Sequence, residues 1–240
     1  MRQPIAFLNT FAHISTMQAK KQKPSALMQD KPRLAKHKPA SEQNSSGFIT
    51  QTQLDDDFFQ KVSYGWTNDV RMLLNMGANP NARGPSSGIT ALMKASLQGH
   101  TDICGLLIER GADVNARAKS SDSKGVTALI GAASSGYPMI CALLIEKGAD
   151  IEAKDAGGRT ALMYAAMKGK TEACDTLTYY GADAGAKDTL NMTAHMIAIE
   201  YKKPATADFL KRMERIQQLV GKENIHNFIF KFRECVAGGV

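Results

Sequence analysis

The sequence predicts an all-α repeat solenoid, in which short helix pairs stack in a row. The segment TALMYAAMKG at 160–169 recurs in related form at 90–99, 127–136 and 193–199. A Gly-Ala-Asn or Gly-Ala-Asp tripeptide also recurs, beginning at Gly77, Gly111, Gly148 and Gly181. Copies lie 33 to 37 residues apart, and both series lengthen at an insert between Ala116 and Gly125. A fixed period of this length is typical of stacked supersecondary units.

Each unit predicts two short helices. A Thr precedes a first helix of small and apolar residues, and Thr is a favoured N-cap. A Gly, such as Gly99, is placed to end that helix. In 102–110 the apolar residues Ile103, Leu106 and Leu107 have the spacing of one helix face. One such pair cannot bury its apolar face alone, whereas a stack of pairs can.

The pattern resembles the ankyrin repeat. The resemblance lies in the T-A-L-M/I-x-A motif at 90–95, 127–132 and 160–165 and in the Gly-Ala-Asp/Asn tripeptides at 77–79, 111–113, 148–150 and 181–183. It covers about residues 55–212 and implies helix pairs joined by β-hairpin finger loops in an L-shaped stack with a concave side. The expected units are about 55–83, 86–117, 123–154, 155–187 and 188–212, within a repeat domain at 51–212.

Four positions depart from the family's T-P-L-H pattern, which has His where this chain has Met93, Ile130, Met163 and Met196. We expect apolar packing there in place of the hydrogen bonds that His makes between repeats. The last unit has His195 where Leu is expected, and we interpret His195 as a hydrogen-bonded core residue. The acidic run Asp55–Asp57 is expected to charge the N-terminus of the first helix.

Two segments flank the expected domain. Residues 1–50 hold eight Lys or Arg against two acidic residues, whereas 51–240 hold 22 against 21. The net charge of +7 therefore belongs to a disordered basic arm, which could serve nuclear import or electrostatic contacts, or stay solvated. The C-terminal extension at 213–240 continues an amphipathic helix expected at 208–220. The pattern at 224–235 suits either a helix or a strand. Its role could be to continue the cap of the stack or to act as a docking or export segment.

The sequence predicts no disulfide, no metal or cofactor site and no membrane-spanning segment. Cys104, Cys141 and Cys174 hold equivalent places in successive second helices. Equivalent sites in packed helices lie roughly 8–10 Å apart, beyond the reach of about 7 Å for a disulfide. They are expected to be core thiols in a reducing cytoplasm. The spacing of Cys and His predicts no metal or cofactor site, and no apolar run approaches the ~18 residues of a span.

The resemblance implies a non-catalytic adaptor or scaffold that binds a partner protein through finger loops and first helices. The finger residues implied are Ser87, Ile89, Lys124, Val126 and Arg159. The first-helix residues implied are Lys94, Leu97, Gln98, Gly131, Ser134, Ser135, Tyr164, Met167, Lys168 and Tyr201. Gly131, Ser134 and Ser135 are small, so they could form a notch for a partner or could merely allow close helix packing.

Two alternatives concern the cellular role. One is a transcription regulator that enters the nucleus by means of the basic arm, and the other is a bacterial effector acting in a host cytosol. The folded part is not expected to bind nucleic acid, and a monomer is expected. An enzyme is not expected, because the flanking segments leave no room for a catalytic domain.

Overall fold

The computed structural model describes residues 50–84, 88–119, 124–221 and 224. Within them, ten helices form five consecutive pairs. The first helices of the pairs are α2 (Gln51–Tyr64), α4 (Ala91–Gln98), α6 (Ala128–Ser135), α8 (Ala161–Met167) and α10 (Ala194–Glu200). The second helices are α3 (Thr67–Asn75), α5 (Thr101–Glu109), α7 (Pro138–Glu146), α9 (Thr171–Tyr179) and α11 (Pro204–Val220).

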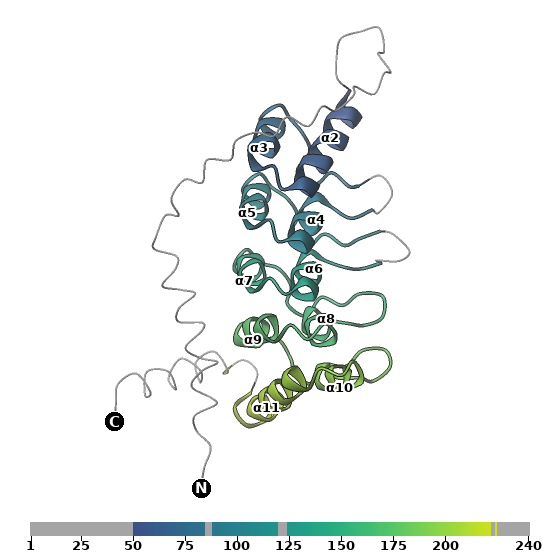
Figure 1. The fold of residues 1–240 in the computed structure, drawn as a ribbon, viewed down its shortest axis with the longest axis vertical. Coiled ribbons are helices and arrows are strands. Elements are labelled where there is room, and N and C mark those ends of the chain that lie inside the picture. The colour runs from purple at the N-terminus through teal and green to yellow at the C-terminus, as the bar shows by residue number, and fades with distance from the viewer. Residues whose placement is uncertain (1–49, 85–87, 120–123, 222–223, 225–240) are drawn as a thin grey trace, which may run out of the picture. The chain divides into compact units, whose positions relative to one another are not determined.

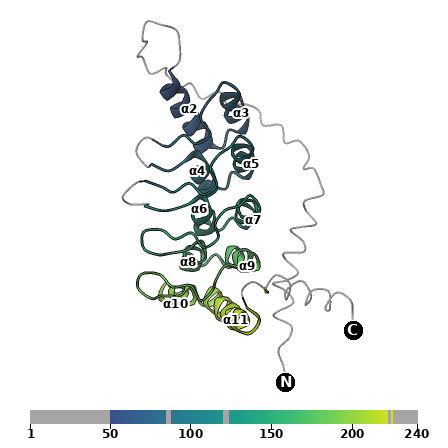
Figure 2. The same ribbon diagram turned by 180° about the vertical axis from the view of Figure 1, so that it is seen from behind.

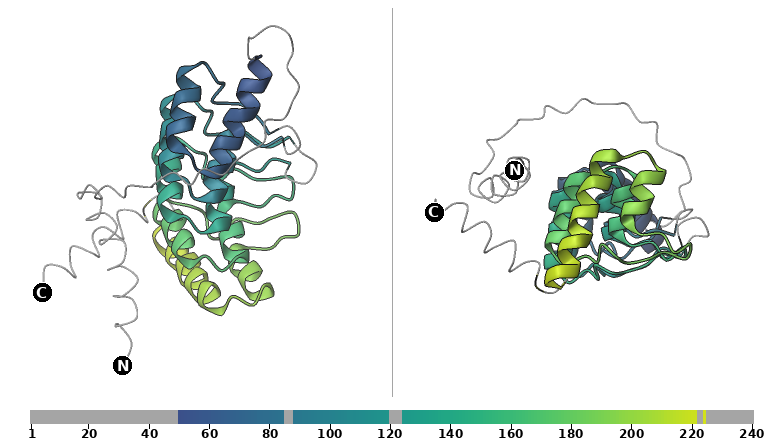
Figure 3. Two further views of the ribbon diagram at one scale, coloured as in Figure 1. Left: turned by 45° about the horizontal axis from the view of Figure 1, so that its top comes forward. Right: turned by 90° about the horizontal axis from the view of Figure 1, so that it is seen from below.

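The helices lie in two layers. Each first helix packs on the next first helix, each second helix packs on the next second helix, and the order is the order of the sequence (Figure 1 and, from behind, Figure 2). The loops that lead into α4, α6, α8 and α10 project together from the layer of first helices (Figure 3). We call them the finger loops. The predicted all-α solenoid is confirmed.

The β-hairpin part of the expectation is not confirmed. Among the described residues the only bridge is an isolated antiparallel one between Arg83 and Thr90. The later finger loops are closed by one or two backbone hydrogen bonds, such as Asp155 N–H to Arg159 O at 3.0 Å.

Three of the four threonines that precede first helices in the recurring motif act as N-caps, as the sequence predicts. The hydroxyl oxygens of Thr90, Thr127 and Thr193 accept hydrogen bonds from the backbone N–H three residues later, at 3.3 to 3.4 Å. These bonds satisfy amides that have no partner inside the helix. Thr160 has the same extended backbone but makes no side-chain cap bond, so that part of the prediction is wrong.

The glycine after a first helix serves cross-repeat packing as well as helix termination. Gly99 has a φ of +84°, and a Cβ atom placed there would lie 2.5 Å from Cζ of Tyr137. Tyr137 is the residue just before α7, so the next repeat covers this glycine directly. The same relation recurs at Gly65 with His100, Gly136 with Lys170 and Gly169 with Lys203. In the last repeat Lys202 occupies the glycine position, with a φ of 55°.

Asparagine side chains link neighbouring repeats at the turns that follow the second helices. Asn115 Nδ2 donates to Gly148 O at 2.9 Å, and its Oδ1 accepts from Asp150 N–H at 2.8 Å. Asn81 makes the same pair of bonds to Gly111 O and Asp113 N–H. We call this repeated contact the asparagine clamp. It satisfies the backbone groups of the turn that follows each second helix.

Toward the C-terminal end of the stack, other side chains take the place of asparagine in the clamp. Glu152 stands in the asparagine place and accepts from Asp183 N–H at 2.8 Å. The buried Gln217 of α11 then donates to Ala182 O at 2.7 Å and accepts from Ala184 N–H at 2.8 Å. The backbone of this last turn is therefore held from both neighbouring repeats.

The three described cysteines are buried and free, which confirms the prediction of core thiols. Burial raises the pKa of the Cys104 thiol to about 11 and that of Cys141 to about 12. Burial also raises the pKa of Cys174. Because the thiolate is the reactive form, these thiols are unreactive at neutral pH. Cys235 lies outside the described residues.

The two ends of the stack correct several expectations. Helix α2 begins at Gln51 after the cap residue Thr50, so Asp55–Asp57 lie past its first turn. Asp55 instead accepts from Asn79 N–H at 2.9 Å. At the other end α11 begins at Pro204, not 208, and runs without a break past the expected boundary at 212.

Exposure at the C-terminal end also differs from expectation. Met196 is 46% exposed, whereas Met93, Ile130 and Met163 are buried, because no further described repeat covers α10. Leu219, an apolar residue near the end of the expected amphipathic helix, is 85% exposed. In the described part of the chain, no helix is long and apolar enough to cross a membrane. The proposals for 1–49 and for 225–240 fall outside the described residues.

Replacing Gly99 by Ala is expected to lower the free energy of unfolding by about 2–4 kcal/mol, from backbone strain and from the clash with Tyr137. Gly77 is the matched control, because its φ is +97° but no atom lies within 4 Å of a Cβ placed there. Gly77→Ala should therefore cost only about 1–2 kcal/mol. Urea unfolding followed by circular dichroism measures both. Equal losses in the two variants would disprove the packing role of Gly99.

Replacing Asn115 by Ala is expected to lower the free energy of unfolding by about 1–3 kcal/mol, since two backbone groups lose their partner. Asn75→Ala, at the exposed end of α3, should stay within about 0.5 kcal/mol of the parent. The same urea experiment compares them. A loss at Asn115 no larger than that at Asn75 would contradict the clamp.

Candidate partner-binding surface

The partner-binding residues expected from the sequence differ in exposure. Those that are exposed are Leu97, Gln98, Lys124, Lys168 and Tyr201. Those that are half-buried are Ile89, Lys94, Val126, Ser134, Ser135, Arg159, Tyr164 and Met167. Gly131 is buried, and Ser87 lies outside the described residues. All the described ones belong to the finger loops, the first helices or the turns after them.

Gly131 serves helix packing. A Cβ atom placed there would lie 3.7 Å from Met93 O and 3.8 Å from Leu97 Cβ, so the residue faces α4. Ser135, one turn later, donates its hydroxyl to Leu97 O at 2.8 Å. The small residues of α6 therefore allow α6 to approach α4 closely, which is the second of the two interpretations made from the sequence. Gly131 offers no contact area to a partner.

A row of cationic side chains joins the finger loops. Arg83 Nη1 donates to Gly88 O in its own loop at 2.6 Å and to Arg117 O at 3.1 Å. Arg117 in turn donates to Lys154 O, and Lys154 Nζ donates to Lys187 O at 3.0 Å. We call Arg83, Arg117, Lys154 and Lys187 the finger ladder. The partner prediction missed these residues, although their common place in each unit is visible in the sequence.

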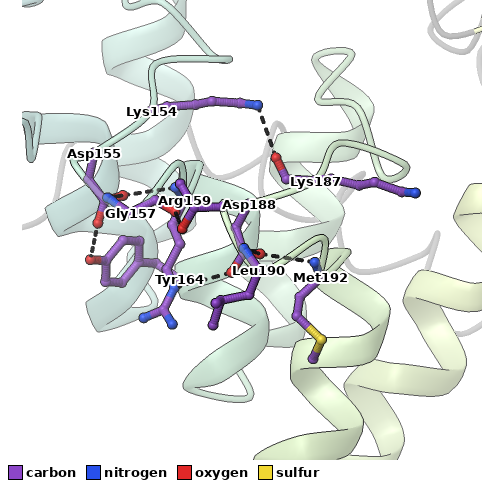
Figure 4. Close-up of polar contacts among 10 residues, drawn as sticks. Lys154, Asp155, Gly157, Arg159, Tyr164, Lys187, Asp188, Leu190 and Met192 are labelled. Carbon is purple, nitrogen blue, oxygen red and sulfur yellow. Dashed lines mark hydrogen bonds and ion pairs between the residues drawn. The ribbon is translucent and has the colours of Figure 1, made fainter.

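The finger loop that leads into α8 is shaped by Asp155 (Figure 4). Its Oδ1 accepts from the backbone N–H of Gly157 at 2.9 Å and of Arg159 at 2.8 Å. Its Oδ2 accepts from the Tyr164 hydroxyl at 2.6 Å. The carboxylate therefore fixes the turn and ties it to helix α8.

The finger loop that leads into α10 repeats this arrangement and is linked to the loop that leads into α8 (Figure 4). The buried Asp188 accepts through Oδ1 from the N–H groups of Leu190 and Met192, each at 2.9 Å. Its Oδ2 lies 3.6 Å from Arg159 Nε. The Arg159 side chain, expected to contact a partner, is thus engaged in an ion pair between neighbouring loops.

Tyr164 is likewise committed to the stack through its hydroxyl. Burial raises the pKa of Tyr164 to about 12, and the neighbouring Asp155 carboxylate contributes to the same shift. The hydroxyl stays protonated and bound to Asp155 over the whole physiological range. Any contribution of Tyr164 to a partner would come from its half-buried ring.

His195, near the C-terminal end of this surface, has a structural role. His195 Nδ1 lies 3.0 Å from Ala207 O, so the ring binds the backbone of α11, as expected of a satisfied histidine. Within the described ranges, no cluster of three or more His, Cys, Asp or Glu could hold a metal ion. The surface offers exposed side chains on a rigid frame, which suits binding.

Tyr164→Phe is expected to reduce the loss of stability at high pH. The folded protein keeps the Tyr164 proton up to about pH 12, whereas an unperturbed tyrosine in the unfolded chain releases it near pH 10. The resulting stabilisation is complete below about pH 10 and is lost as the pH rises toward 12. Urea unfolding at pH 8 and pH 11 should show a smaller difference for the variant than for the parent. The same difference in both proteins would contradict the assignment.

A protein-family model matches this chain. The model, described as ankyrin repeats in three copies, matches residues 58–155 and 153–218. Ankyrin repeats generally act as protein–protein interaction modules. The matched span covers about two thirds of the sequence and includes nine of the helices described above completely or nearly so, α3 to α11. The chain therefore belongs to the ankyrin-repeat family.

Proposed function

We propose that this chain is a non-catalytic adaptor or scaffold that binds a partner protein through its first helices and finger loops. The observation that carries the proposal is the set of bonds from loop to loop. The finger ladder and the Arg159–Asp188 pair fix neighbouring loops relative to one another before any partner arrives. A surface ordered in advance loses less conformational entropy on binding.

The exposed residues of this surface suit a protein partner. Leu97 on α4 is 43% exposed and Tyr201 after α10 is 44% exposed. Met167, at the end of α8, is half-buried. Aromatic residues and Met are enriched at protein interfaces, where they supply apolar contact area. Gly131 is left out of the proposed surface because it is buried against α4.

The proposed place of action is a reducing compartment such as the cytoplasm. Support comes from Cys104, Cys141 and Cys174, which are all free thiols. Free cysteines are usual in cytosolic proteins, where thiols are kept reduced.

The surface is tested with two double variants of the full chain. Leu97→Gln with Met167→Gln changes the proposed surface, and Met72→Gln with Met139→Gln changes exposed methionines of the outer helices α3 and α7. A partner first captured by the unmodified chain is purified, and its affinity for each protein is measured by calorimetry. The first pair should weaken binding at least tenfold, about 1.4 kcal/mol. The second pair should leave the affinity unchanged.

The opposite ranking would place the partner on the outer helices and overturn the proposed surface. Circular dichroism and a urea unfolding curve for each variant show that any loss of affinity is not a loss of fold. If both double variants unfold at the same urea concentration, they are equally stable, and their affinities can be compared directly.

A further inference from the structure

Charge is divided between the two sides of the central repeats. In repeats two to four, the described residues of the finger loops and first helices include eight Lys or Arg and one acidic residue. The second helices of these repeats and the turns on either side of them (99–115, 136–152 and 169–185) include three Lys or Arg and nine acidic residues. The net charge of residues 51–240 is close to zero, so it gives no sign of this separation. The basic side coincides with the surface of the proposed function.

Five of the eight cations are exposed. They are Arg117, Lys119, Lys124, Lys154 and Lys168, and we call them the basic face. The acidic residue among them is Asp155, whose two carboxylate oxygens accept three hydrogen bonds from its own loop and from Tyr164 (Figure 4). This carboxylate keeps its charge but is committed to these bonds, and the described cations of this side outnumber it.

The finger ladder gives part of the basic face a fixed geometry. Arg117 donates to Lys154 O and Lys154 donates to Lys187 O, so each cation is anchored on the next repeat. Cations held in a row along the stack attract a chain of anionic groups without a large loss of side-chain entropy. A surface of one sign also steers an oppositely charged partner toward it and disfavours a like-charged one.

The finger loops and first helices of repeats two and three also carry apolar side chains. Leu97 on α4 is exposed, and Ile89 and Val126, on the finger loops that lead into α4 and α6, are half-buried. Single-stranded nucleic acid that is bound without sequence preference stacks its bases on aromatic rings beside the cations. Here aliphatic side chains accompany the cations, and aliphatic side chains match the apolar residues of a protein segment.

We propose that the partner presents an acidic protein segment, rich in Asp or Glu with interspersed apolar residues, to the basic face. This inference rests on the proposed function, because it assigns the chemistry of the partner to the same surface. The carboxylates would pair with the exposed cations, and the apolar residues would contact Leu97, Ile89 and Val126.

The test uses a random 16-residue peptide library selected on the immobilised full chain. Lys124→Glu with Lys168→Glu reverses two exposed cations of the basic face that are not part of the finger ladder. Arg71→Glu with Lys211→Glu reverses two exposed cations on the outer helices and is the matched control. Both variants change the net charge equally and leave residues 1–50 unaltered, so any contribution of the basic arm is the same in both.

The expected result is that peptides selected on the parent are enriched in Asp and Glu relative to the library. Their affinity should fall at least tenfold with Lys124→Glu and Lys168→Glu, and it should fall less than twofold with the control pair. It should also weaken as NaCl is raised, because exposed charges are screened. Selected peptides that are neutral or basic, or equal effects of the two variants, would overturn the proposal.

A labelled 20-base-pair DNA duplex is measured in parallel with the same proteins. Duplex binding as tight as that of the selected peptides, and lost with the same two lysines, would identify a nucleic-acid surface and overturn the acidic-protein inference. The Leu97 and Met167 experiment separates the two proposals. If that experiment succeeds while the peptides show no acidic preference, the surface stands and only the chemistry of the partner fails.

Discussion

Each repeat of this protein is completed by the next one, and the rest of the structure depends on that contact. Gly99 ends α4, but its missing side chain also leaves the space in which Tyr137 of the following repeat lies. Asn115 ends no helix, yet its amide satisfies backbone groups of the turn one repeat further on. A helix pair taken alone would leave an uncovered apolar face and unsatisfied backbone groups.

This dependence explains how the two ends differ from the middle. At the start of the described stack, Trp66 holds the place that Tyr137 has in the third repeat, and it has no glycine of an earlier repeat to cover. It packs instead against Tyr64, with ring centroids 5.4 Å apart, and beneath the Lys61 ammonium group, 4.5 Å from the ring centroid. These contacts partly replace the missing neighbour.

At the other end, Lys202 stands where a further repeat would need glycine. In the earlier repeats a Cβ atom at this position would lie less than 3 Å from the covering side chain. The side chain of Lys202 therefore opposes the addition of a sixth unit in the same register. Gln217 provides the clamp from α11 instead, which ends the series without leaving the turn at Ala182–Ala184 unsatisfied.

The same contacts that stabilise the stack also organise the surface proposed for binding. Arg117 and Lys154 bind backbone carbonyls of the following repeat, so the cations are held where the loops emerge. Asp155 and Asp188 use their carboxylates to fold the loops, which removes much of the negative charge from competition with a partner. Stability and the proposed recognition thus draw on one set of residues.

The sequence by itself determined the repeat, the helix pairs and the buried thiols, because these follow from local periodicity, caps and terminating glycines. Through the family resemblance it also predicted on which side of the stack a partner would bind. Only the tertiary structure decided that Gly131 packs on α4, that Met196 is exposed and that Arg159 is paired with Asp188. Each of these outcomes depends on what a neighbouring repeat places opposite the residue, and a pattern within one repeat cannot contain that information.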